Sequence, residues 1–254
     1  MSDVTDKASL PYPEGADQPD VAGDMQNLAG VLDGIVTPKY ADATAMNTAN
    51  PSPTTGDRCF RSDLGAELVY RGGTLGWRLA GEVLWAEHVF AGSTSFVTFS
   101  SIPAIGTHLR IVTALRCAQA TFDSEAFMEF NGHTGANYNV SWYDLDTSAA
   151  NISDNFLTAQ NNTLGAIKVC GNSYSGGARA LGEVLISNYR ESGGVITWKA
   201  VSYATDGGTA LNSRHAGGAV SAAGTSGPLT SIKIGSAAGS NFTSGSKISV
   251  YILP

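Results

Sequence analysis

The sequence contains few charged residues and no basic cluster. Asp, Glu, Lys and Arg together make up 15% of the 254 residues, against the roughly 25% usual for soluble domains. The net charge of -7 is concentrated in residues 1–42, which hold eight acidic residues and two lysines, whereas the remainder holds 14 acidic and 13 basic residues. Nucleic acids and anionic membranes attract proteins with basic patches. The composition therefore argues against both as partners.

The sequence also lacks a long apolar run and a secretory signal. No stretch reaches the roughly 18 apolar residues of a membrane-spanning helix. The first residues, Met1 to Asp6, lack the positive start and apolar core of a signal peptide. We therefore expect synthesis in the cytosol, no export by the general secretory route and no membrane insertion.

Motifs for metal binding, cofactor binding and nucleophilic catalysis are missing. Cys59, Cys117 and Cys170 are odd in number and widely spaced, which favours buried free thiols over a disulfide framework or a zinc site. The four histidines lack the short-range pairing of metal ligands, and we expect each at a strand end or in a loop. No serine nucleophile elbow or phosphate-binding glycine loop occurs. We expect no metal, no cofactor and no enzymatic activity.

Two pairs of acidic residues are compatible with one kind of enzyme, a glycosidase. Glu125 with Glu129, or Asp144 with Asp146, are candidates for the two carboxylates of a glycosidase, whose chemistry depends on their separation in space. Asp144 and Asp146 also resemble the opening of a calcium loop, but the glycine and distal glutamate of that loop are missing. We favour a turn after a strand that ends at Tyr143.

The N-terminal segment combines an extended arm with one short helix. Residues 1–20 hold five acidic residues, three prolines and little to bury, so we expect them to be extended or disordered in isolation. From Asp20 to about Gly34 the spacing predicts an amphipathic helix. Its apolar stripe consists of Val21, Met25, Leu28, Leu32 and Ile35. The stripe spans about two heptads, so either the helix lies on its own domain or several copies pack around a common axis.

Residues 38–80 predict a small, turn-rich segment. The Ala/Thr-rich run 39–50 predicts a short helix that ends before Pro51. Three strands follow, at 58–61, 67–71 and 77–79, and form a meander too small to be stable alone.

The larger part of the chain, residues 81–254, predicts an antiparallel sandwich. Thirty glycines and 43% apolar residues fit many short strands around a real core. We expect a jelly-roll-like sandwich of eight to ten strands, one helical turn within 146–164 from Ile152, Phe156 and Leu157, and a core anchor at Phe242. The expected strands are 82–90, 94–99, 108–116, 126–130, 138–143, 165–170, 182–187, 195–203, 231–234 and 248–253.

Aromatic residues are the remaining candidates for ligand binding, because an exposed ring stacks on the apolar face of a sugar. Trp142 and Trp198 fall in mid-strand, where core packing is the favoured role. Tyr174 and Tyr189 lie in or beside Gly/Ser loops, and we favour these two as ligand-binding residues. Tyr143 and Tyr203 complete the set.

Several motifs together resemble the N-terminal half of minor tail and tail-fibre proteins of tailed bacteriophages. They occur in order over about residues 10–80, at Tyr12 to Gly15, Pro38 to Tyr40, Pro51 to Pro53, Gly56 to Phe60, Asp63 to Gly65, Leu68 to Tyr70 and Gly72 to Trp77. The last 26 residues, with Asn241-Phe242 and Gly245-Ser246, are similar to the end of C-terminal domains in such proteins. The resemblance implies a homotrimeric virion component, assembled in the host cytoplasm, whose outer domain adheres to a host-surface glycan.

The sequence thus predicts three parts: an attachment and oligomerisation segment (1–50), a β-meander (51–80) and a β-sandwich (81–254). A head fibre or capsid decoration protein is the alternative within the same class. A surface-polysaccharide hydrolase and a monomeric carbohydrate-binding module are the alternatives from other classes.

Overall fold

The structure is a computed structural model that describes most of the chain after residue 36. It describes residues 37–73, 75–121, 123–146, 151–160, 162–163, 165–173, 177–191, 195–205, 211–220 and 228–254, and two short strands before them, β1 (Asp3–Val4) and β2 (Pro11–Tyr12). The chain divides into two compact units, Met1–Gly72 and Gly73–Pro254. The predicted helical stripe of residues 21–35 lies outside the described residues. Among the described helices, none has the length and apolarity needed to cross a membrane.

The first unit contains a short helix and most of a small sheet, whose last strand comes after the division at Gly72. Helix α2 (Ala43–Ala49) begins where the Asp42 carboxylate accepts a hydrogen bond from the Ala45 backbone N–H, which satisfies one of the unpaired donors of its first turn. The predicted helix before Pro51 is therefore confirmed. The sheet has the strand order β3-β4-β5-β6, and so contains the three predicted meander strands and one more. Its strands are β3 (Lys39–Tyr40), β4 (Arg58–Arg61), β5 (Ala66–Tyr70) and β6 (Trp77–Leu79).

The second unit is the predicted antiparallel β-sandwich. Its strands are β7 (Val83–Val89), β8 (Phe96–Ser100), β9 (His108–Leu115), β10 (Asp123–Phe130), β11 (Tyr138–Asp146), β12 (Asn151–Gln160), β13 (Ile167–Cys170), β14 (Ala180–Ser187), β15 (Ile196–Thr205), β16 (Leu211–Val220), β17 (Ser231–Ser236) and β18 (Lys247–Leu253).

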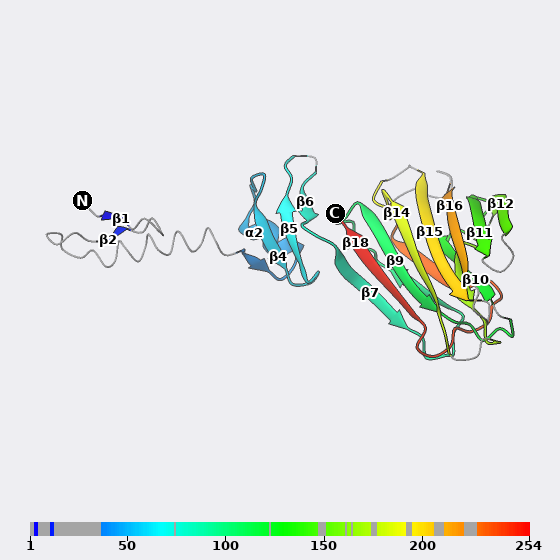
Figure 1. The fold of residues 1–254 in the computed structure, drawn as a ribbon. Coiled ribbons are helices and arrows are strands. Elements are labelled where there is room, and N and C mark those ends of the chain that lie inside the picture. The colour runs from blue at the N-terminus through cyan, green and yellow to red at the C-terminus, as the bar shows by residue number, and fades with distance from the viewer. Residues whose placement is uncertain are drawn as a thin grey trace. The chain divides into compact units, whose positions relative to one another are not determined.

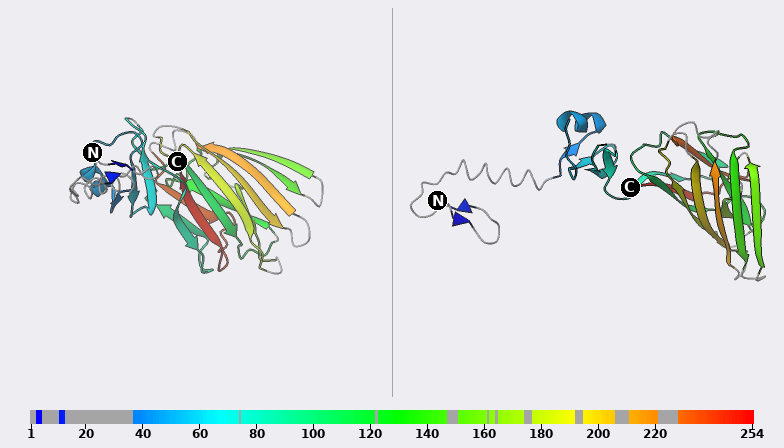
Figure 2. Two further views of the ribbon diagram at one scale, coloured as in Figure 1. Left: turned by 60° about the vertical axis from the view of Figure 1, so that its left-hand side comes forward. Right: turned by 90° about the horizontal axis from the view of Figure 1, so that it is seen from above.

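The strands form two sheets of unequal size. The eight-stranded sheet has the order β12-β11-β16-β15-β14-β9-β18-β7, which can be followed across the sandwich in Figure 1, and the four-stranded sheet has the order β13-β10-β17-β8. Figure 2 shows the two sheets as layers, one behind the other. Strand β18 pairs with β7 on one side and with β9 on the other, so the predicted C-terminal strand lies inside a sheet.

The core lies between the two sheets. Burial alternates along β9 and β14, because successive side chains of a strand point to opposite faces. Ile111, Val184 and Val250 from the large sheet and Met128 and Ile234 from the small sheet are fully buried. Phe242 is also fully buried, and its ring centroid lies 4.6 Å from that of Phe90, so the predicted anchor of the last loop is confirmed.

Two parts of the sandwich differ from the sequence-based prediction. The prediction of a helical turn within 146–164 is wrong, because β12 is an edge strand that pairs with β11. Ile152 and Phe156 are four residues apart, and that spacing fits a strand of period two as well as a helical turn. Strand β16 was not predicted, because its sequence has few apolar residues and includes Gly217 and Gly218. It lies between β15 and β11, which supply hydrogen-bonding partners on both sides.

Candidate functional site on the outer face of the large sheet

The outer face is the surface of the eight-stranded sheet that points away from the four-stranded sheet. It carries side chains that alternate with those of the core, and many of them are apolar. Seven large hydrophobic residues on this face are exposed: Leu84, Val89, Tyr143, Leu145, Phe156, Leu181 and Tyr203. Isolated exposed hydrophobic residues are common, but Tyr143, Leu145 and Phe156 lie together on β11 and β12, and contiguous exposed apolar residues are typical of a surface that contacts a partner or ligand.

An open groove of about 420 Å³, here called the aromatic groove, crosses β12, β11 and β16 on this face. Phe156, on the edge strand, is 70% exposed. The rings of Tyr143 and His215 lie parallel, with centroids 4.9 Å apart and an interplanar angle of 2°. The groove is lined by Ser141, Trp142, Tyr143, Asn155, Phe156, His215, Ala216 and Gly217.

The register of three strands assembles the aromatic groove. Tyr143 is directly opposite His215 on β16, and Ser141 is opposite Phe156 on β12 and Gly217 on β16. Directly opposite residues share one face of a sheet, so these side chains gather although they come from distant parts of the chain. Gly217 has no side chain and leaves the space beside Ser141 open.

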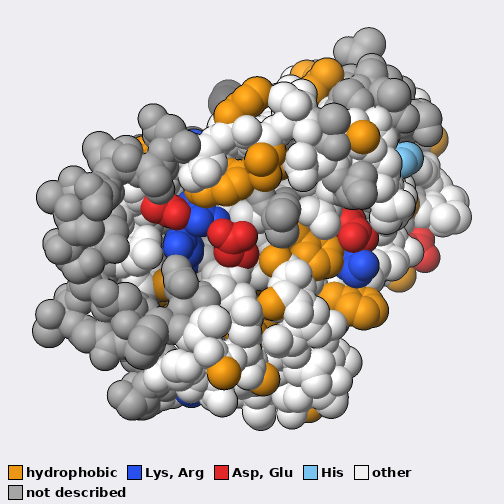
Figure 3. Space-filling model, turned by 90° about the vertical axis from the view of Figure 1, so that its right-hand side faces the viewer, with side chains coloured by type: hydrophobic (Ala, Val, Ile, Leu, Met, Phe, Trp, Pro, Cys, Tyr) orange, Lys and Arg blue, Asp and Glu red, His pale blue; other side chains and the backbone are white. Residues whose placement is uncertain are grey.

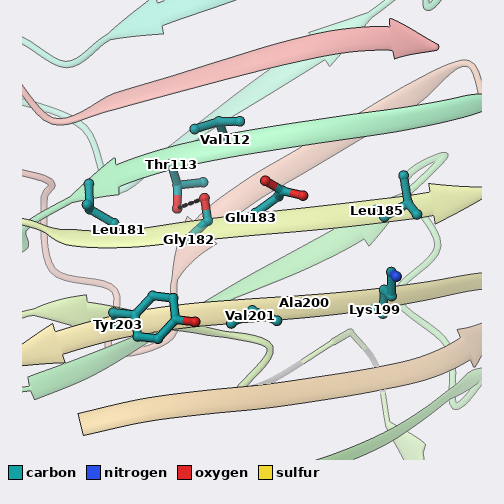
Figure 4. A pocket seen from close by; sticks show the side chains of 10 residues that line it. All are labelled: Val112, Thr113, Leu181, Gly182, Glu183, Leu185, Lys199, Ala200, Val201 and Tyr203. Atoms are coloured by element: carbon teal, nitrogen blue, oxygen red, sulfur yellow. Dashed lines mark hydrogen bonds between the residues drawn. The ribbon is translucent and has the colours of Figure 1, made fainter. Parts of the chain in front are cut away.

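A second groove, here called the apolar groove, crosses β9, β14 and β15 on the same outer face. Its volume is about 530 Å³. Figure 4 shows Leu181, Glu183 and Leu185 along β14, with Lys199 and Tyr203 on the neighbouring strand β15. The remaining lining residues are Val112, Thr113, Gly182, Ala200 and Val201.

Tyr189, one of the two loop tyrosines favoured by sequence, does not form part of this site. Tyr189 is fully buried, and its hydroxyl donates to the Pro103 carbonyl oxygen at 2.6 Å and accepts from the Gly106 N–H at 3.2 Å. Burial raises the pKa of the Tyr189 phenol above its ordinary value, against the effect of backbone hydrogen bonds. The prediction that Tyr189 offers a free ring is therefore wrong, since the ring fixes the segment before β9. Tyr174 lies outside the described residues.

The two tryptophans point toward the interior. Trp198 on β15 is 4% exposed, in agreement with the core role favoured from sequence. Trp142 on β11 is half-buried, and the Arg214 guanidinium lies 5.2 Å from its ring centroid. Because Trp142 and Tyr143 are consecutive in a strand, one faces the core and the other faces outward. Tyr143 is the outward residue, and it is 39% exposed.

Arg214 on β16 joins two of the predicted carboxylates in a buried ion-pair cluster. Its side chain is 3% exposed, and its guanidinium makes a bidentate contact with Asp144, both distances being 2.6 Å. Nη1 of Arg214 also donates to Glu125 Oε1 at 2.6 Å and to the Gly165 carbonyl oxygen. Lys168 Nζ lies 3.6 Å from Asp144. The cluster connects β10 and β13 of the small sheet to β11 and β16 of the large sheet.

The opposite charges of this cluster pair with one another, which fits a role in stabilising the fold. Burial alone would raise the pKa of Asp144, but hydrogen bonds from Arg214 and the positive charges of Arg214 and Lys168 hold it below its ordinary value. A general acid of a glycosidase needs a raised pKa. Asp144 lies within β11, and not in the turn expected from sequence. Glu129, the other candidate, is paired with Lys233 at 3.1 Å.

Other sequence candidates for metal or disulfide chemistry have ordinary structural roles. In the described part of the chain no group of three potential metal ligands gathers. Cys59, Cys117 and Cys170 are free and buried, as predicted. His215 lies in the middle of β16, and not at a strand end as expected. Among the described residues on the side shown in Figure 3, acidic and basic side chains lie next to one another.

Comparisons with known proteins give little further information. No family model and no curated protein matches the chain. Weak similarities among solved structures include the VP2 subviral particle of infectious bursal disease virus, with 10% identity and a TM-score of 0.12 over 84% of this chain and 57% of that chain. A structure of the Gt strain of that virus has 13% identity and a TM-score of 0.13 over 84% and 56% of the two chains. The chain thus spans little more than half the length of these structures, and similarities at this level support no conclusion about function.

Proposed function

We propose that this chain is a structural component of a tailed-phage virion, most simply a tail-fibre or minor tail protein, whose sandwich binds a glycan on the host surface. The support for the virion role is the ordered series of motifs in residues 10–80 and the motifs near the C-terminus. The division at Gly72 into a small unit and a β-sandwich agrees with a part that attaches and a part that is presented outward.

The aromatic groove carries the proposed glycan binding. Phe156 and Tyr143 present exposed apolar ring surface beside Ser141 and Asn155. Sugar rings stack on aromatic side chains through their C–H faces, while hydroxyl and amide groups bind their hydroxyls. A neutral saccharide suits this groove, because the lining residues that the structure describes include no carboxylate and no lysine or arginine.

The proposal assigns no catalysis to the chain. A hydrolase would need a carboxyl group held protonated near the substrate, whereas the Asp144 and Glu125 carboxylates are both bound by Arg214. The proposed assembly is a homotrimer on the particle surface, attached to other virion proteins through the N-terminal segment. In that assembly Val21, Met25, Leu28, Leu32 and Ile35 provide the contacts between helices.

Binding of the full chain to a panel of host cell-wall and capsule glycans tests the proposed adhesion. Tyr143→Ala and Phe156→Ala are each expected to weaken the affinity roughly tenfold, which corresponds to ~1.4 kcal/mol of stacking. Phe96→Ala is the matched control, because Phe96 is 50% exposed on β8 of the other sheet. Equal losses in all three variants, or no binding by the wild type, would contradict the proposed site.

The position in the particle needs a separate experiment. Mass spectrometry of purified virions should detect the chain, and antibody labelling in negative-stain images should place it on the tail. Label on the head would favour the alternative of a head fibre or decoration protein. Release of products from host polysaccharide by the purified chain would favour a hydrolase.

A further inference from the structure

We infer that the apolar groove on β9, β14 and β15 is the contact between copies of this chain, with Glu183 of one copy facing Lys199 of the next. This goes beyond the proposed function, which places contacts between copies only in residues 21–35. The inference rests on the apolar lining of the groove and on the pattern of its two charges.

The lining of the apolar groove is mainly hydrophobic and partly open to solvent. Leu181 is 60% exposed and Tyr203 is 44% exposed, and the two are directly opposite each other on β14 and β15. Leu185, Val112 and Val201 are half-buried and extend the apolar surface. Contiguous apolar surface of this kind on a sheet face is stabilised by packing against another surface.

Two charged residues, Glu183 on β14 and Lys199 on β15, lie within this apolar surface, at diagonal positions of a group of four outward-facing residues. Glu183 is opposite Val201, and Leu185 is opposite Lys199. Glu183 and Lys199 therefore occupy one diagonal, and Leu185 and Val201 occupy the other (Figure 4). Each of the two strands thus contributes two successive outward-facing residues to this group of four.

Within one chain these two charges are poorly matched. The Glu183 side chain is 57% exposed, and its nearest cation, Arg110, lies at 3.7 Å and is also paired with Glu82. For Lys199, the described residues provide no ion pair. Burial of either charge against a purely apolar partner would be costly. A partner with the opposite charge at the matching place avoids that cost.

Another copy of the same chain supplies such a partner. In a closed ring such as the proposed homotrimer, the Glu183 side of one copy contacts the Lys199 side of the next, while the apolar residues pack across the same contact. Electrostatic complementarity of this kind selects the partner, and a neutral saccharide would leave Lys199 without an opposite charge.

Charge reversal of the full chain tests the inference. Wild type should have a light-scattering mass of at least twice 26.3 kDa. Glu183→Lys and Lys199→Glu should each raise the protein concentration at which the assembly dissociates by about tenfold or more, and the double variant should return toward wild type because it restores opposite charges. Affinity for a glycan bound in the aromatic groove should stay unchanged in all three variants.

Replacement of an apolar residue of the groove by aspartate, with a matched control elsewhere, provides a second test. Leu181→Asp should promote dissociation, whereas Leu75→Asp should not, although Leu75 is 53% exposed and so similar to Leu181. Circular dichroism checks that the sandwich is intact, which we expect because Leu181 points outward. A monomeric wild type, or dissociation curves that are identical for wild type, Leu181→Asp and Glu183→Lys, would overturn the inference whether or not the chain binds glycan.

Discussion

At the residue scale, the ion-pair cluster of Arg214, Asp144, Glu125 and Lys168 places charge between the two sheets, with Arg214 and Lys168 buried and Asp144 and Glu125 half-buried. Such a cluster costs desolvation, so it adds little to stability compared with a well-packed apolar core. It does hold two sheets in one register, because the planar guanidinium requires two carboxylates at fixed places. Removal of Arg214 takes away the charged partner that Asp144 and Glu125 share.

Arg214→Leu is therefore expected to lower the free energy of unfolding by about 3 kcal/mol or more, since Asp144 would remain half-buried with only Lys168 near it. Urea denaturation followed by tryptophan fluorescence measures the change. Lys247→Leu is the control, because Lys247 is an exposed member of an ion pair with Glu87, and exposed pairs contribute far less. A similar loss in both variants would mean that the buried cluster has no special role.

The free energy of unfolding should depend on pH in a way that reflects ionisation of the Asp144 carboxylate. Its folded pKa lies below its ordinary value, so its contribution is present above the unfolded pKa of about 3.9 and is lost as the pH falls through the folded pKa. The difference in unfolding free energy between wild type and Asp144→Asn should therefore shrink as the pH is lowered below about 4. A constant difference between pH 7 and pH 2 would show that folding does not shift the pKa of Asp144.

At the element scale, β16 shows how glycine permits a strand in a crowded sheet. A Cβ added to Gly218 would lie 2.1 Å from the Asn139 carbonyl oxygen and 2.8 Å from the Trp198 ring. The same addition at Gly217 would meet only the Trp198 carbonyl oxygen, at 3.4 Å. The two glycines are neighbours in sequence, yet only one of them is required for packing.

Gly218→Ala should therefore lower the free energy of unfolding by about 3 kcal/mol, because backbone and ring would have to move. Gly217→Ala should have little effect or stabilise by roughly 0.5 kcal/mol, since alanine reduces the entropy of the unfolded chain. Thermal and urea unfolding of both variants provide the comparison. Equal effects would indicate that β16 is not held against Trp198 as the structure has it.

Most elements of the sandwich follow from local sequence, and the exceptions have identifiable causes. Strands such as β9 and β18 alternate apolar and other residues, and this period predicts them directly. The alternation does not predict β16, whose place depends on its two neighbours. Of the aromatic groove, Trp142 and Tyr143 are among the rings predicted from sequence. The sequence instead favours a helical turn for Phe156 and a strand end or loop for His215, because their gathering depends on register between strands that are far apart in sequence.

At the scale of the whole molecule, the proposed homotrimer makes a prediction about the N-terminal segment. Leu28→Asp combined with Leu32→Asp should lower the light-scattering mass of the full chain from three times 26.3 kDa, because charges at core positions of packed helices are costly. Ala29→Asp, a change outside the apolar stripe, is the control and should keep the wild-type mass. If the double variant keeps that mass, the copies are held together by other surfaces, with the apolar groove as the first candidate.

The sequence alone determined the class of the fold, the free buried cysteines and the placement of most strands, because composition and side-chain alternation are local properties. It also placed the acidic residues at the N-terminal end. Only the tertiary structure decided which of two consecutive aromatic residues faces outward, which carboxylates Arg214 binds, and which side chains share the outer face. These features depend on strand register, and register is fixed by the combined packing of both sheets around one core.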